Sequence, residues 1–230
     1  MIFITGDTHI PIDMGKLNEL NFPDCKNLIK NDYVIICGDF GGVWENSEKE
    51  LYWREWLNNK PWTTLFVDGN HENFDLLNSY KVEEWHGGKV HFITETIIHL
   101  MRGQVFNIDG SKFFTMGGAT SVDQENRQEH ITWWEEEIPN QIEMNEGLYN
   151  LAENNNEVDY ILTHTCSSSI LQDITKIFGF QPKPQENLNK YLQIIEEKVK
   201  FKHWYFGHFH EDIEIDKKHT LLFEKIIKIQ

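Results

Sequence analysis

Residues 1–9 read MIFITGDTH, and this stretch sets a pattern that the rest of the chain repeats. A hydrophobic run leads into a glycine and then into Asp7 and His9, two side chains that can bind metal. Short runs rich in β-branched and aromatic residues favour buried strands. The stretch therefore predicts a strand over residues 1–5 that ends in a polar loop.

Four more hydrophobic runs along the chain also lead into residues that can bind metal. Similar hydrophobic runs cover residues 33–37, 63–67, 158–162 and 203–206. The segments that follow them are Gly38-Asp39, Gly69-Asn70-His71-Glu72, Thr163-His164 and Gly207-His208-Phe209-His210. In an open α/β sheet, ligands bind beyond the carboxyl ends of the strands, so these segments are expected to meet. Asp, Asn and His supply oxygen and nitrogen donors that suit divalent Mn, Fe or Zn.

The five motifs, DxH, GD, GNH[DE], H and GHxH in this order, resemble the signature of the calcineurin-like metallophosphoesterases and extend from Asp7 to His210. One such motif occurs often by chance, whereas five in order at predicted strand ends are specific. The resemblance implies hydrolysis of a phosphomonoester or phosphodiester by attack of a metal-bridging hydroxide. It also implies an α/β fold, a four-layer α/β/β/α sandwich of two mixed β-sheets flanked by helices.

By the same resemblance, seven side chains would bind two divalent metal ions. They are Asp7, His9 and His210 on one ion, Asn70, His164 and His208 on the other, and Asp39 as the bridge. Two cations about 3.5–4 Å apart can share a carboxylate, lower the pKa of a water and clamp the oxygens of an in-line displacement. We expect residues 208–210 to be extended, so that both imidazoles point to one side and Phe209 to the other.

The resemblance gives His71 a catalytic role over the substrate. A protonated imidazole can donate a proton to the leaving-group oxygen, and histidine suits this task because its pKa lies near neutrality. The alternative is that His71 only orients its neighbours. Glu72 is expected to begin a helix over residues 72–79 and to stabilise its first turn, or else to orient a nearby ligand.

The motifs differ from those of protein serine/threonine phosphatases in the same superfamily. Those enzymes carry GDxVDRG and RGNHE, with two arginines for the phosphate and an aspartate that pairs with the catalytic histidine. Here residues 38–44 read GDFGGVW and residues 68–72 read DGNHE, so all three are missing. The chain therefore resembles the broader, mostly bacterial branch of small-molecule phosphodiesterases and phosphatases.

Arg127 is the candidate for a cation that binds the substrate phosphate. It closes the glycine-rich segment 116–127, which follows an expected strand at residues 112–115. Glycine lets the backbone approach a ligand, and a guanidinium matches phosphate in a bidentate fork. The alternative is a salt bridge with Asp123 or Glu125.

Composition bounds the organisation and the partners. With 230 residues, 40% of them hydrophobic, the chain is expected to be a single domain over residues 1–230. A formal net charge of −16 argues against duplex nucleic acid, which needs a basic surface. Bound divalent ions would reverse the charge locally, which favours a small phosphorylated substrate, a nucleotide or a sugar phosphate, over duplex DNA.

The expected location is the cytoplasm, with no membrane association. No apolar run reaches the length of a membrane span, and the first motif starts too near Met1 for a signal peptide. The three scattered cysteines do not suggest a disulfide framework.

Three tryptophans have more than one possible role. Trp44 could line the active site or pack in the core. Trp133-Trp134 could form a lid or a dimer contact, so the chain could be a monomer or a homodimer.

Two other functions are compatible with this resemblance. One is a non-catalytic metal-binding scaffold of the same fold, and the other is a nuclease of the same superfamily. The complete ligand set and the presence of His71 favour an enzyme over a scaffold. The acidic composition and the single-domain length count against a nuclease.

The coarse element pattern is mixed. Helices are expected around residues 16–20 and at 48–58 and 72–79, alternating with strands, which argues for a parallel sheet. From residue 89 to 116 short strands follow one another, as in an antiparallel addition. Residues 135–157 read as a helix and loop insertion, and residues 221–229 as a closing strand.

Overall fold

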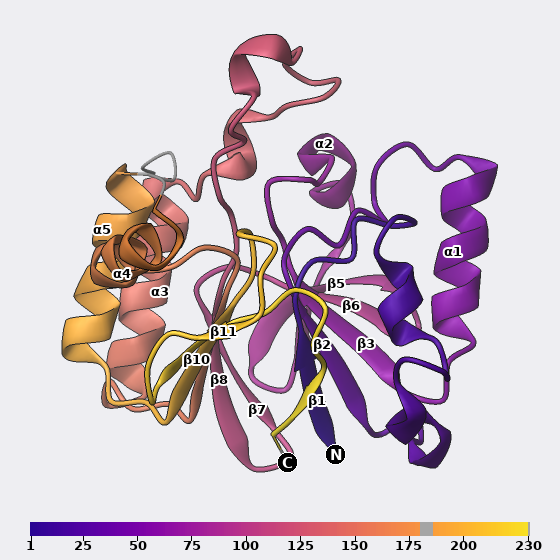
Figure 1. Ribbon diagram of the computed structural model, residues 1–230, viewed down its shortest axis with the longest axis horizontal. Coiled ribbons are helices and arrows are strands. Elements are labelled where there is room, and N and C mark those ends of the chain that lie inside the picture. The colour runs from indigo at the N-terminus through magenta and orange to yellow at the C-terminus, as the bar shows by residue number, and fades with distance from the viewer. Residues whose placement is uncertain (180–185, 230) are drawn as a thin grey trace.

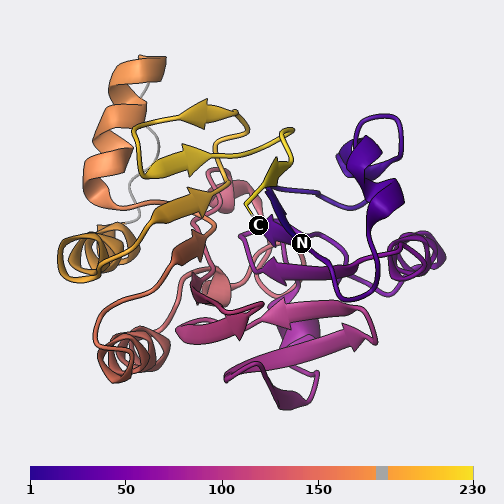
Figure 2. The same ribbon diagram turned by 90° about the horizontal axis from the view of Figure 1, so that it is seen from below.

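The computed structural model describes residues 1–179 and 186–229. It contains two mixed β-sheets packed face to face, with helices on both outer surfaces (Figure 1, Figure 2). The expected four-layer α/β/β/α sandwich is therefore confirmed.

The first sheet carries the first three motifs. Among the described residues it has seven strands, in the order β13 (Ile227–Lys228), β1 (Ile2–Thr5), β2 (Tyr33–Cys37), β3 (Thr63–Val67), β6 (Ile97–Leu100), β5 (Gly88–Thr94) and β4 (Val82–Trp85). Strands β1, β2, β3 and β6 run parallel to one another, whereas β13, β5 and β4 are antiparallel to their neighbours.

The second sheet carries the last two motifs. Its six strands within the described ranges follow the order β11 (Ile213–Glu214), β12 (His219–Leu221), β10 (His203–Phe206), β9 (Tyr160–Thr163), β8 (Ser111–Met116) and β7 (Gln104–Ile108). The four central strands are parallel and the two edge strands are antiparallel. The chain crosses from one sheet to the other between β6 and β7.

Helices cover the two outer faces. Helix α1 (Glu48–Asn58) packs on the first sheet, and the short α2 (Phe74–Leu77) follows β3. Helices α3 (Gln141–Glu153), α4 (Ser168–Phe178) and α5 (Glu186–Lys198) cover the second sheet (Figure 1). Short 3₁₀ turns lie at Met14–Leu17, Pro23–Asn27, Gln124–Asn126 and Glu135–Glu137.

Alternating side chains give each sheet two buried faces. Ile2 and Ile4 belong to the core between the sheets, together with Leu162, whereas Phe3 belongs to the core on the α1 side. Trp204 packs in a third core beneath the helices of the second sheet. Strands buried on both faces have continuous hydrophobic runs, which is why the five runs are recognisable in the sequence.

Three expectations about element boundaries were wrong. The closing strand at 221–229 is two short strands, β12 and β13, which belong to different sheets. The helix expected at 72–79 is only α2, because the Asn73 side chain accepts a hydrogen bond from Leu76 N (3.0 Å) and caps it one residue after Glu72. The helix around 16–20 is the 3₁₀ turn at Met14–Leu17.

The parallel strands bring the five motifs to one end of the two sheets. The segment between β8 and α3 rises beyond the same end (Figure 1). Among the described helices, none is both long and apolar enough to cross a membrane.

Candidate metal centre

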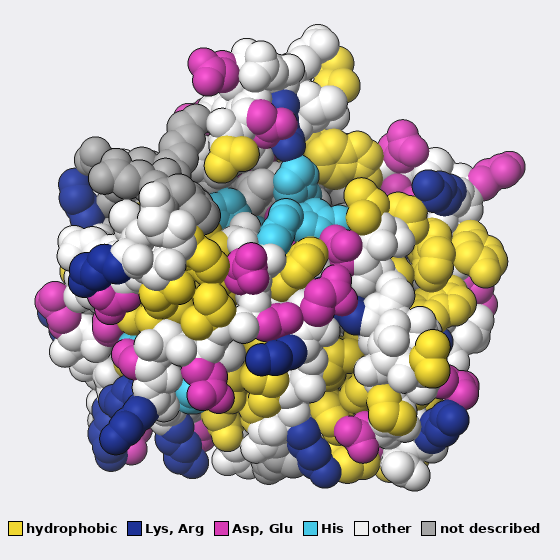
Figure 3. Space-filling view, viewed as in Figure 1, with side chains coloured by type: hydrophobic (Ala, Val, Ile, Leu, Met, Phe, Trp, Pro, Cys, Tyr) yellow, Lys and Arg dark blue, Asp and Glu magenta, His cyan; other side chains and the backbone are white. Residues whose placement is uncertain are grey.

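The motif side chains meet where the parallel strands end. Asp7 lies two residues after β1, Asp39 two after β2, Asn70 three after β3 and His164 one after β9. All four side chains are buried. Figure 3 shows histidine side chains gathered in a hollow on this face, with hydrophobic side chains beside them.

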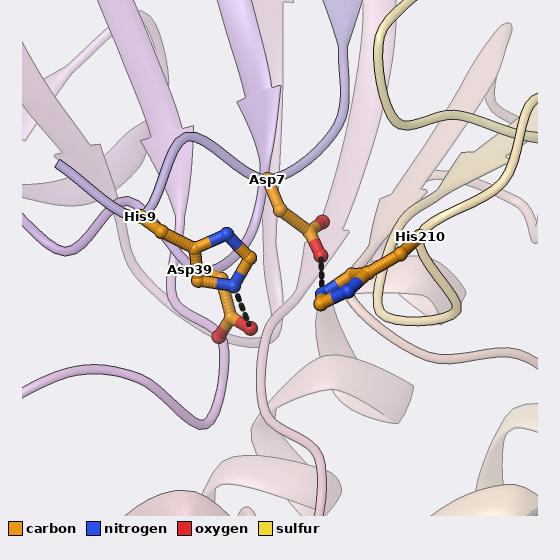
Figure 4. A group of neighbouring side chains, drawn as sticks. All are labelled: Asp7, His9, Asp39 and His210. Carbon is orange, nitrogen blue, oxygen red and sulfur yellow. Dashed lines mark hydrogen bonds and ion pairs between the residues drawn. The ribbon is translucent and has the colours of Figure 1, made fainter. Parts of the chain in front are cut away.

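One group of four ligands is compact. Asp7, His9, Asp39 and His210 each offer one ligand atom, and these atoms all lie within 4.8 Å of one another (Figure 4). His9 Nε2 is 3.2 Å from Asp39 Oδ2, and His210 Nε2 is 3.3 Å from Asp7 Oδ2. The carboxylates are buried whereas the His210 side chain is 52% exposed, so the group opens to solvent on one side.

A second group adjoins the first through Asp39. His164 Nε2 lies 3.2 Å from Asp39 Oδ1 and 3.2 Å from Asn70 Oδ1. The ring of His208 is 5.0 Å from the ring of His164, in an edge-on arrangement. Asp39 thus faces the two groups with different oxygens, and the structure brings all seven expected ligand side chains together.

Hydrogen bonds fix which nitrogen of two histidines faces Asp39. His164 Nδ1 donates to the carbonyl oxygen of Cys37 (2.9 Å), which can only accept. His9 Nδ1 is 2.6 Å from the carboxylate of Asp13. Each contact leaves Nε2 as the nitrogen that faces Asp39, the position from which a neutral imidazole can bind a metal. The sequence did not predict this contact of Asp13 with His9, although the spacing of four residues between them could have indicated it.

The amide of Asn70 is also oriented by its surroundings. Its Nδ2 donates to Ser121 Oγ (3.3 Å), and Ser121 Oγ donates to Glu137 Oε1 (3.0 Å). This chain of donors turns Asn70 Oδ1 toward His164. Burial raises the pKa of Glu137 to about 7, although the hydrogen bonds from Ser121 oppose the shift. The sequence did not predict these roles of Ser121 and Glu137, because Asn70, Ser121 and Glu137 come from separate loops.

The electrostatics of the cluster favour positive charge. Burial lowers the pKa of His164, but the carboxylates of Asp39 and Asp7 outweigh it and raise that pKa to about 10. Burial would raise the pKa of Asp39, yet His164 holds it well below its ordinary value. Two carboxylates without bulk water around them need a cation nearby, and their oxygen and imidazole donors suit a divalent one. The residues therefore fit the metal ions that the motifs imply.

The glycines of three motifs make room for ligands of other motifs. A Cβ added at any of them would overlap a ligand side chain. At Gly38 it would overlap the His164 ring, at Gly69 the Asp39 carboxylate, and at Gly207 the Asp7 carboxylate. The motifs GD, GN and GH therefore require glycine for space.

We expect Gly207→Ala to bind metal at least about 10-fold more weakly, since displaced ligand geometry costs at least as much as a lost outer-shell contact. The added methyl would displace Asp7 and would also crowd Cys37 O. Elemental analysis after reconstitution with Mn measures the effect. Gly15→Ala is the matched control, because nothing lies within 4 Å of its added Cβ. Equal metal content in both variants would contradict the packing argument.

Four of the expected ligands adopt a left-handed backbone conformation. The φ values are 35° for His9, 46° for Asp39, 74° for His208 and 53° for His210. Such values are uncommon outside glycine and concentrate at functional sites. The expected extended conformation of residues 208–210 was therefore wrong. Both imidazoles reach the site through tight turns, while Phe209 packs against the core of the second sheet.

His71 lies beside the cluster without belonging to it. Its backbone N–H donates to Asp39 Oδ1 (2.8 Å), and its ring stands edge-on to the His9 ring at 5.3 Å. In the described part of the chain, no group hydrogen-bonds to the His71 imidazole. Burial lowers the pKa of His71 and Arg127 adds to this, although Asp39 opposes it.

Glu72 braces the loop that carries Asp39. Its Oε1 accepts hydrogen bonds from the backbone N–H of Phe40 (2.7 Å) and of Gly41 (3.4 Å). Burial, together with the nearby Asp39, raises the pKa of Glu72 well above its ordinary value. The expected helix-capping role was wrong, and the alternative of orienting a ligand fits the observed contacts.

A buried ion pair fixes Asp68, which lies between the end of β3 and Asn70 in the sequence. Asp68 accepts two hydrogen bonds from Arg102, from Nε (2.8 Å) and Nη2 (2.6 Å), and lies 3.1 Å from His99 Nε2. Burial would raise the pKa of Asp68, but Arg102 lowers it below its ordinary range. Arg102 therefore supports the loop that carries Asn70 and His71.

Arg127 forms one of the two salt bridges left open as alternatives. Its Nε donates to Asp123 Oδ1 (2.7 Å), and its Nη1 donates to the carbonyl oxygen of Thr132 (3.2 Å). Asp123 is half exposed, so this pair lies at the surface. Arg127 is near enough to affect the pKa of His71, and its role toward phosphate stays a prediction.

The model of one protein family, described as calcineurin-like phosphoesterase, matches residues 1–212. The chain belongs to this family. A comparison with curated proteins finds no match. Together, the family and the cluster of Asp7, His9, Asp39 and His210 support a metal-dependent phosphoester hydrolase.

Proposed function

We propose that the protein is a dinuclear metal-dependent phosphoesterase that hydrolyses a small, nucleotide-like phosphomonoester or phosphodiester. The observation that carries the proposal is Asp39, whose two carboxylate oxygens face different histidines, His9 and His164, each at 3.2 Å. A carboxylate in this position can serve two cations at once.

Each half of the site has its own ligands. Asp7, His9 and His210 would hold one ion, and Asn70, His164 and His208 the other. Their nitrogen and oxygen donors suit Mn, Fe or Zn. When bound, such a pair lowers the pKa of a water and neutralises charge on the phosphate.

His71 supplies the proton for the leaving group in this proposal. Its ring adjoins His9 at 5.3 Å but makes no hydrogen bond to the described residues, so it is free to meet a substrate oxygen. The backbone contact with Asp39 fixes its position relative to the ligands. A lowered pKa makes the imidazole a stronger acid once it is protonated.

Arg127 contacts the non-reacting oxygens of the phosphate in this proposal. We expect Arg127→Lys to be impaired, because lysine keeps the charge and loses the bidentate fork. The comparison of kcat and KM for wild type, Arg127→Lys and Arg127→Ala measures this. A raised KM with unchanged kcat indicates equal binding before and during reaction, and a lowered kcat indicates a contact that tightens in the transition state.

Thermal stability of the same variants separates the two roles of Arg127. Normal kinetics with a lower Tm would assign Arg127 to the Asp123 salt bridge alone. Such surface pairs contribute at most about 1 kcal/mol, so a large loss of stability is not expected.

The substrate class is tested by a screen of metal-reconstituted protein against phosphomonoesters, cyclic and linear phosphodiesters and dinucleotides. We expect hydrolysis of small esters and its loss on chelation. With a net charge of −16, duplex nucleic acid is expected to be a poor substrate. Absence of any hydrolysis by protein that binds two metals would favour the scaffold, and cleavage of duplex DNA would favour the nuclease.

The proposed location is the cytoplasm. Cys25, Cys37 and Cys166 are all buried and unpaired. Unpaired cysteines are compatible with a reducing compartment.

A further inference from the structure

A cavity of about 360 Å³ adjoins the metal centre on the side of His71. His9 and His71 form one wall, so the cavity is continuous with the candidate catalytic site. Its other walls include Ile10, Pro11, Ile12 and Trp44. The volume lies within the range of small-molecule sites, about 300–1,000 Å³.

The apolar wall is built on a fixed backbone. Trp44 N donates to Glu50 Oε1 (2.9 Å), and Trp44 O accepts from Asn73 Nδ2 (2.7 Å). The Trp44 ring stands edge-on to the ring of Trp134 at 5.2 Å, and Trp134 Nε1 donates to Asp75 (2.8 Å). Trp44 is therefore held in place before any ligand binds. Trp134 is buried behind it, so this residue packs in the core.

The buried charge in this wall is already neutralised. The Glu50 carboxylate accepts hydrogen bonds from the backbone N–H of Trp44, Glu45 and Asn46, and from Arg54. Its charge is thus matched within the protein and is not directed at a ligand. The cavity offers a ligand more hydrophobic than polar surface, and its polar lining includes Glu45, Ser47 and Lys49 besides the two imidazoles.

We propose that this cavity binds the leaving group of the substrate, and that the leaving group carries an aromatic ring, as in a nucleoside or an aryl alcohol. This inference rests on the proposed function, because it takes the phosphate to lie at the metal centre. With the phosphate there, a leaving group whose oxygen meets His71 extends into the cavity that His71 lines. A flat ring buries its faces against Trp44 and Ile12, and stacking of a base on an aromatic side chain does not depend on which base it is.

Two matched substrate pairs test the proposal. Uridine 5′-monophosphate and ribose 5-phosphate carry the same ester with and without a base. Benzyl and cyclohexylmethyl phosphate carry a flat and a puckered ring of similar size. Each is offered as a monoester and as a methyl diester, and the ratio of kcat/KM within each pair is measured. We expect a ratio of about 10 in favour of the aromatic member, near the lower end of what base stacking contributes.

Variants connect these ratios to the cavity. Trp44→Ala is expected to bring the ratios close to one. Ile12→Ser changes a side chain that is 80% exposed, so it does not threaten the fold, and it is expected to lower the ratios about threefold through lost apolar contact. Leu20→Ser is the matched control, because Leu20 is 87% exposed and does not line the cavity.

The outcomes separate the subsite from the proposed function. A preference in only one pair identifies the leaving group as a nucleoside or as an aryl alcohol. Ratios near one for both pairs, or ratios unchanged in Trp44→Ala and Ile12→Ser, overturn the subsite while hydrolysis itself stands. If no ester is hydrolysed, the proposed function fails. In that case, ligand-observed NMR with uridine and metal-free protein tests the subsite. We expect uridine to bind to the wild type and to bind more weakly to Ile12→Ser. An absence of uridine binding overturns the proposed subsite.

Discussion

Asp39→Asn is expected to lose hydrolytic activity by more than about 100-fold, together with most of the bound metal. Substitution of partners outside the ligand shell costs about 10–100-fold, and a ligand shared by two ions should cost at least the upper end of that range. Asparagine has the same shape, but it removes the charge that faces His9 and His164 and turns a donor toward the cations. Elemental analysis and initial rates on one sample measure both losses.

Asp24→Asn controls for the removal of a carboxylate, because Asp24 is exposed and belongs to none of the five motifs. A melting curve for each variant verifies that the proteins are folded. If Asp39→Asn retains two ions per chain and the wild-type rate, Asp39 is not a shared ligand.

His71→Ala is expected to behave differently, keeping its metal and losing rate. A single general acid contributes about 10²–10⁴-fold, so a loss in this range is expected for esters of poorly acidic alcohols. Nitrophenolate leaves without a proton, so the deficit should shrink for nitrophenyl esters. Metal retention is expected because the His71 ring contacts His9 only edge-on and makes no hydrogen bond to a ligand in the described residues.

The comparison of leaving groups decides the role of His71. Equal losses for alkyl and nitrophenyl esters would show that His71 is not the acid. A parallel loss of metal would make His71 a structural support of Asp39, to which its backbone already donates.

The ligands could be predicted from the sequence because each follows a recognisable strand. β2 and β3 have the expected boundaries, since their hydrophobic runs are buried on both faces and end just before Gly38 and Asp68. Such runs bring the ligands to one end of the two sheets. The glycines of the motifs are also explained, because ligands from other motifs fill the space beside them.

The parts that could not be predicted depend on contacts between distant loops. The orientation of Asn70 depends on Ser121, about 50 residues further along the chain, and on Glu137, which lies beyond it, and no local pattern marks these contacts. The turn at His208 was missed because strand alternation was extended past the end of β10. Asn73 was a visible capping signal for α2, but Glu72 was given that role instead.

Metal stoichiometry tests the central claim most directly. The protein is stripped with a chelator, reconstituted with Mn and freed of excess ion, and the metal per folded chain is then measured by elemental analysis. We expect two ions per chain, because seven ligand side chains converge and Asp39 faces both groups. A value near zero in folded protein would contradict the account and favour a scaffold that has kept the fold without the chemistry.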